Sequence, residues 1–167
     1  TRSGLNQDYG EKESLNPAAK LYLLAFDTDI DLMWRAKGSK PQSFGADFSR
    51  NMGSALEIHG EWARTLNAKR NVVSPGGVVS SNEEDYNSWL LGLRYLTQNE
   101  VTWIVEYLHN GRSYSTSEFD NYYAFIDDAV SPGATTAQLQ KARQILQSGY
   151  SKANAGENYL YLRASVN

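Results

Sequence analysis

The segment LYLLAFDTDIDLMWRA, residues 21–36, alternates between two chemical classes of side chain. The even positions are mostly aromatic or aliphatic, from Tyr22 to Trp34, whereas the odd positions include three aspartates and Arg35. Successive side chains of a β-strand point to opposite faces of a sheet, so a period of two gives each face its own chemistry. A helix would spread the same residues around its circumference. We therefore predict one strand over residues 20–36, with one apolar and one largely polar face.

The same alternation recurs along the chain, and it predicts an antiparallel meander of about six strands. Short polar segments with glycine, proline or asparagine separate several of these strands and predict turns. The further strands are expected at residues 43–50, 55–64, 86–96, 101–109 and 157–166, and the turns at 37–42, 51–54 and 97–100.

One segment has a helical period instead of a strand period. Residues 135–148 begin at Thr135 or Thr136, either of which can cap a helix, and Gly149 follows as a stop signal. The apolar stripe of this predicted helix consists of Leu139, Ala142 and Leu146.

The remaining segments are polar and aperiodic, which predicts a lead-in loop over residues 1–19 and long loops over 65–85 and 110–156. In a meander, every other connection lies at the same end of the sheet. The turns at 51–54 and 97–100 would then share one end, and the longer connections the other. Bacterial outer-membrane barrels sort their connections in this way. We expect a single all-β domain over 1–167 that forms part of a transmembrane β-barrel, with one short helix in a long loop.

Composition excludes several other classes of protein. The chain has 167 residues, a net charge of −3 and no cysteine, so disulfides and thiolate chemistry are absent and nothing indicates a nucleic-acid partner. No apolar run approaches the ~18 residues of a membrane helix, although barrel strands need only ~9–11 alternating residues. Trp34, Trp62, Tyr95 and Tyr107 lie near strand ends, where barrels place their aromatic girdles.

Two hairpins carry a resemblance to a known family. YNSWLLGLRYLTQNEVTWIVEYLHNGRSYS (86–115) and FGADFSRNMGSALEIHGEWAR (44–64) resemble hairpins of Gram-negative outer-membrane barrels, with porin-like and alginate-export-like barrels closest. Whole proteins of that kind carry a signal peptide and end in an aromatic residue, whereas this chain starts TRSGLNQDYG and ends ASVN. Six strands are also fewer than the ~8 of the smallest single-chain barrels. The chain is therefore interpreted as an internal segment of a larger barrel, or as a protomer that closes with other copies.

The resemblance implies a porin-like channel component in the bacterial outer membrane, through which small polar solutes or ions diffuse passively. Membrane lipid is its expected partner, further strands or a homo-oligomer would complete it, and no enzyme activity, cofactor or metal is expected. The lipid-facing residues would be Tyr22, Leu24, Phe26, Ile30, Leu32, Trp34, Trp62, Trp89, Leu91, Leu93, Tyr95, Trp103, Val105 and Tyr107. The pore-lining residues would be Asp27, Asp29, Asp31, Arg35, Asp47, Glu57, His59, Glu61, Arg94, Glu106 and Arg163.

The sequence signals for metal binding and for catalysis are weaker than those for a barrel. The triple Glu57, His59 and Glu61 shares one strand face, but i, i+2 neighbours lie ~6.6–7 Å apart, which is wide for holding one metal ion. The three aspartates of residues 27–31 lack the glycine-turned loop of a calcium site. No nucleophile elbow accompanies the two histidines. The alternatives are a soluble calycin-like barrel that binds a small ligand on its apolar face, and an outer-membrane hydrolase.

Overall fold

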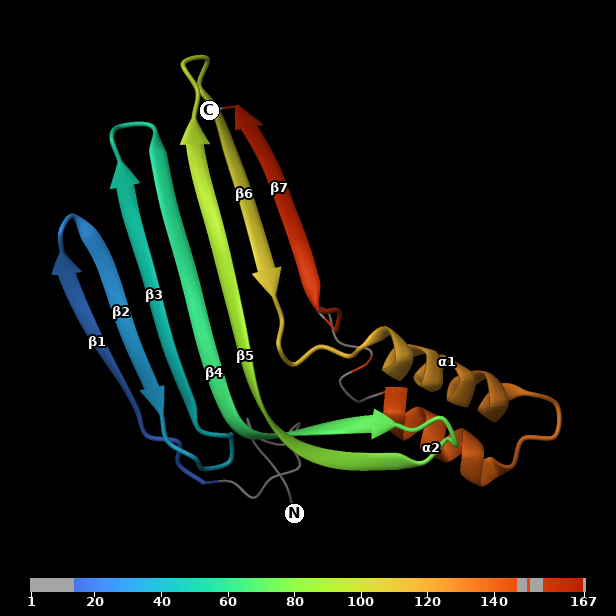
Figure 1. Cartoon of the computed structure of the whole chain (residues 1–167). Coiled ribbons are helices and arrows are strands. Elements are labelled where there is room, and N and C mark those ends of the chain that lie inside the picture. Colours follow the sequence, from blue (N-terminus) through green and yellow to red (C-terminus); the bar gives the residue numbers. More distant parts are fainter. Residues whose placement is uncertain (1–13, 147–149, 151–154, 167) are drawn as a thin grey trace. The chain divides into compact units, whose positions relative to one another are not determined.

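The computed structural model describes residues 14–146, 150 and 155–166. Its strands form one antiparallel sheet in the order β1-β2-β3-β4-β5-β6-β7, an up-and-down meander whose edges are β1 and β7 (Figure 1). The all-β class and the meander are thus confirmed, with one strand more than expected and with a sheet that is not closed. The elements are β1 (Ala18–Ala25), β2 (Thr28–Arg35), β3 (Ser43–Met52), β4 (Leu56–Val73), β5 (Val79–Leu96), β6 (Val101–His109), α1 (Thr116–Val130), α2 (Thr136–Leu146) and β7 (Asn158–Val166).

The first predicted strand is in fact a hairpin. The chain reverses at Phe26 and Asp27, whose φ angles are 53° and 55°, as in the two-residue turns whose twist matches paired strands. Residues 21–26 are apolar at both parities, so only the part after the turn truly alternates. The prediction of one strand over 20–36 is therefore wrong.

The predicted loop over residues 65–85 is also largely strand. β4 continues to Val73 and β5 starts at Val79, so that only a short turn joins two strands of 18 residues each. Polar side chains occupy both parities of much of this stretch, and the alternation that marks a half-buried strand is therefore missing. The expectation of a long aperiodic loop here is wrong.

The chain forms two compact units. The first, called here the sheet unit, comprises described residues within 1–67, 85–111 and 158–167. The second, called the helical unit, comprises described residues within 68–84 and 112–157, which include the far ends of β4 and β5 and both helices.

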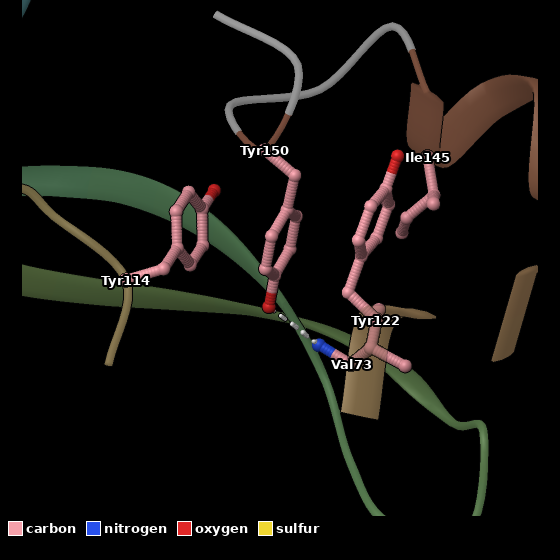
Figure 2. Close-up of a cluster of buried hydrophobic side chains, with 5 residues drawn as sticks. All are labelled: Val73, Tyr114, Tyr122, Ile145 and Tyr150. Carbon is pink, nitrogen blue, oxygen red and sulfur yellow. Dashed lines mark hydrogen bonds between the residues drawn. The ribbon is translucent and has the colours of Figure 1, made fainter. Parts of the chain in front are cut away.

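The helical unit has its own hydrophobic core. Three tyrosine rings stack in it: Tyr114 on Tyr150 at 3.7 Å between centroids, and Tyr150 on Tyr122 at 4.5 Å (Figure 2). Val73 and Ile145 complete the buried cluster, and the Val73 backbone N–H donates a hydrogen bond of 3.3 Å to the Tyr150 hydroxyl oxygen. Residues from β4, from both helices and from the segment that follows α2 therefore stabilise one another.

The largely buried guanidinium group of Arg70 connects several parts of the helical unit. Arg70 donates to the Ser113 carbonyl at 2.6 Å and pairs with Glu118 at 3.0 Å and Glu84 at 3.2 Å. It also lies 5.1 Å from the centre of the Tyr114 ring, a cation–π contact. Because Arg70 is on β4 and Glu118 is on α1, the ion pair between them links the β4–β5 hairpin to α1.

The helix expected at 135–148 is confirmed, with bounds Thr136–Leu146. Thr135 caps it, since its hydroxyl accepts from the Gln138 N–H at 3.3 Å and its own N–H donates to the Gln138 side chain at 2.7 Å. Its buried face differs from the expected stripe. Of that stripe only Ala142 is buried, together with Ile145, while Leu139 and Leu146 are exposed. Gly149, the expected stop residue, lies outside the described residues.

The first helix was not expected at all. Ser115 caps α1 in a complete capping box with Glu118. Neither described helix is long and apolar enough to cross a membrane.

We expect the helical unit to lose stability in strong alkali. Burial raises the pKa of Tyr114 to about 12, and burial also raises the pKa values of Tyr122 and Tyr150. A raised tyrosine pKa means that the folded state holds the proton more tightly, so the stabilisation is complete below about pH 10 and declines as the pH rises toward 12. Tyrosinate absorbance should show these late-titrating groups, and Tyr114→Phe should remove one of them. Identical titrations of the variant and the wild type would contradict this assignment.

Candidate functional site: the two faces of the sheet

The two faces of the sheet unit follow from the strand register. Residues directly opposite each other on antiparallel strands share a face. Leu21 lies opposite Leu32 and Phe44 opposite Trp34, and the same face continues through the far strands, where Tyr95 lies opposite Trp103. The large apolar residues of this face are Leu21, Leu23, Ile30, Leu32, Trp34, Phe44, Phe48, Ile58, Trp62, Trp89, Leu91, Leu93, Tyr95, Trp103, Val105, Tyr107, Leu160 and Leu162. The same face also carries Arg50 opposite Ile58, Arg64 opposite Phe44 and His109 opposite Trp89.

The apolar face has no cover among the described residues. The side chains of Trp34, Trp62, Trp89 and Trp103 are between 37% and 41% exposed, so they do not gather inside a globule. All hydrophobic residues that are buried in the described part of the chain, such as Val73 and Tyr150, belong instead to the helical unit. The sheet unit therefore presents a broad apolar surface rather than a core.

The opposite face is polar and charged. All the residues predicted to line a pore lie on it except Asp27, which is in the first turn. Its charged strand residues are the six acids Asp29, Asp31, Asp47, Glu57, Glu61 and Glu106 and the four bases Lys20, Arg35, Arg94 and Arg163, with His59 among them.

Three of the residues predicted to face lipid are placed differently. Tyr22 lies opposite Asp31 and Leu24 opposite Asp29, both on the polar face, and Phe26 is in the turn. The tyrosine hydroxyl donates a hydrogen bond to the Asp29 carboxylate. None of the three lies on the apolar face, because the hairpin that was not expected reverses the parity between β1 and β2.

Cross-strand pairs organise the charges of the polar face. Lys20 on β1 contacts Asp31 on β2 at 2.7 Å. Glu57 on β4 accepts from the Ser49 hydroxyl at 3.3 Å and lies 3.7 Å from Arg94 on β5. Lys20 was absent from the predicted set, and adding it while removing Asp27 brings acids and bases closer to balance.

A depression of about 640 Å³ lies over the sheet unit near the start of β1. Most of its lining residues have side chains on the polar face, among them Lys20, Asp47, Glu61 and Ser88. The depression thus lies mainly on the polar face near the start of β1, and apolar atoms form most of its wall.

Metal and nucleophile chemistry find no support in this arrangement. Within the part of the chain that the structure describes, no three His, Asp or Glu side chains are placed to hold a metal ion. Glu57 turns to Arg94 and His59 turns to Glu106, so the triple of alternate residues on β4 does not converge on one point. The charged side chains of this face can bind water and can attract or repel ions.

Comparisons of this chain with protein-family models, with curated proteins and with solved structures found no match in any of the three.

Proposed function

We propose that this chain is part of a bacterial outer-membrane β-barrel that works as a porin-like channel for small polar solutes or ions. The observation that carries the proposal is the apolar face, which is contiguous over the sheet unit and uncovered among the described residues. Exposed apolar patches on soluble monomers rarely exceed a few hundred Å². Lipid chains would cover this face, and water would fill the charged side.

The arrangement of the connections supports the same proposal. The chain between successive strands of the sheet spans only residues 26–27, 53–55 and 97–100 at one end. The alternate connections are residues 36–42, the short turn 74–78 between the two longest strands, and the long segment 110–157 with its two helices. Outer-membrane barrels have short periplasmic turns and longer extracellular loops, so the longer connections of this chain would be extracellular.

The direction of the edge strands restricts how such a barrel closes. β1 and β7 are separated by an even number of reversals in the antiparallel order and therefore run in the same direction. If identical copies joined edge to edge around a common axis, β7 of one copy would meet β1 of the next in parallel. Single-chain outer-membrane barrels are antiparallel, with an even number of strands. Completion of the barrel therefore takes an odd number of additional strands rather than copies of this sheet alone.

The experiment is to ask where the protein resides and whether it conducts. Expressed from its own gene in a Gram-negative host, it should fractionate with the outer membrane and require detergent for extraction. In planar lipid bilayers the purified protein should give discrete ionic current steps. Solubility without detergent, with binding of an apolar ligand, would favour the calycin-like alternative.

Arg94→Ala is expected to leave assembly intact and to increase the preference for cations. Its side chain is more than half exposed on the polar face, 3.7 Å from Glu57, so its removal leaves that carboxylate without its paired cation. Reversal potentials in a salt gradient across a bilayer measure the change. An unchanged reversal potential would mean that Arg94 does not face the conducting path.

A further inference from the structure

A glycine on the polar face has its space occupied by a histidine from the neighbouring strand. A Cβ atom at Gly92, on β5, would lie 2.1 Å from the Nε2 atom of His59, on β4. Real Cβ atoms do not approach other atoms so closely. The imidazole therefore lies directly over the backbone of β5, and it can lie there only because residue 92 has no side chain.

The same ring reaches the next strand across the glycine. Its Nε2 atom is 3.3 Å from Oε1 of Glu106, on β6, and Glu106 is the direct register partner of Gly92. A carboxylate accepts hydrogen bonds, so the histidine tautomer that fits this contact has its hydrogen on Nε2 and donates a hydrogen bond to Oε1. The side chains of His59 and Glu106 are 22% and 30% exposed, so both are held largely against the sheet.

Two of the neighbouring charges pair with each other, and Arg163 on β7 and Glu61 on β4 also lie on this face. Arg94, two residues along β5, lies against Glu57. The residue opposite Glu106 on β7 is Tyr161, which carries no charge at neutral pH. Within the described residues, His59 is the recorded partner of the Glu106 carboxylate.

We propose that His59 determines the ion selectivity of this channel by holding Glu106 against the wall over Gly92. Glu106 is otherwise a carboxylate directed into the water column, where it would attract cations. With the ring in place, the carboxylate is partly covered and hydrogen-bonded, and its charge acts less on passing ions. Gly92 is the residue that makes this contact possible. The inference rests on the proposed channel function, and it adds the residues that set its selectivity.

The decisive variant changes no charge. Gly92→Ala should displace the imidazole and release Glu106, so that the ratio of K⁺ to Cl⁻ permeability rises by roughly twofold or more, the order that unit charges in a watery environment allow. The matched control is Gly45→Ala on the same face, where a Cβ would meet its nearest neighbours at 3.5 Å and fit. That control should leave the permeability ratio unchanged.

His59→Ala serves where Gly92→Ala does not fold, because it removes the ring without requiring new space. It should raise the permeability ratio in the same direction, and adding Glu106→Gln should cancel the rise. An unchanged ratio in both folded single variants would overturn the proposal.

A second readout does not depend on conduction. In a His109→Gln background, His59 is the remaining histidine, and its acylation by diethyl pyrocarbonate reports how well the ring is covered. Gly92→Ala should speed this reaction several-fold, while Gly45→Ala should not. If the reactivity changes but the permeability ratio does not, the contact exists without setting selectivity, and the proposal is wrong. If the wild type gives no current, the channel function itself fails, whatever the reactivity shows.

Discussion

Leu91→Arg is expected to prevent the protein from assembling in membranes. Leu91 is 55% exposed on the apolar face, between Trp89 and Leu93, in the part of β5 that belongs to the sheet unit. If that face meets lipid, an arginine near the bilayer midplane costs about 2–4 kcal/mol. The free energy of unfolding from lipid vesicles, measured by urea titration, should fall by this amount, and the yield in the outer-membrane fraction should drop.

The neighbouring residue gives the matched control. Leu90 has the same side chain on the same strand, but it lies opposite Leu108 on the polar face. Leu90→Arg should therefore assemble like the wild type, because its charge would enter the aqueous side. If the two variants behave alike, or if Leu91→Arg is harmless, the assignment of the apolar face to lipid is wrong.

Tyr122→Ala should unfold the helical unit locally. The Tyr122 ring is 6% exposed and stacks on Tyr150 at an interplanar angle of 4°. Removal of a large aromatic side chain from a packed core typically costs about 3–5 kcal/mol. Amide hydrogen exchange in α1 and α2 should become much faster, whereas exchange in β2 and β3, which belong to the sheet unit, should stay as it is.

The adjacent Tyr123 provides a control, because it is the same residue type as Tyr122 but is not buried. Tyr123 is 57% exposed, so Tyr123→Ala should change exchange in the helices little. Comparable effects of the two substitutions would show that the stacked tyrosines do not form the core of this unit.

Strands with clean alternation could be predicted from the sequence, and the register confirms their faces. The segments 86–96 and 101–109 fall on β5 and β6 with Leu91 and Val105 on the expected side. Alternation sufficed there because every second residue is apolar. It failed at β1, where both parities are apolar, and the turn at Phe26 and Asp27 contains neither the glycine nor the asparagine that usually marks a hairpin.

The helical unit was harder to predict because its contacts are distant in sequence. Val73 and Tyr150 are 77 residues apart, and no local sequence pattern predicts the hydrogen bond between them. One usable signal was present: Ser115 followed by Glu118 is a capping-box spacing and marks the start of α1. The contact between His59 and Glu106 also joins residues that are distant in sequence. Only the strand register shows that Gly92 lies between them.

The open edges of the sheet have a practical consequence for handling the protein. β1 and β7 each leave a row of backbone N–H and C=O groups without strand partners in the described sheet. Exposed strand edges readily template association with other chains, and proline or inward-pointing charge is the usual protection. β7 contains no proline and carries one charged residue, Arg163. We therefore expect the chain to form β-rich aggregates when it is produced without detergent or lipid, and to need refolding from inclusion bodies.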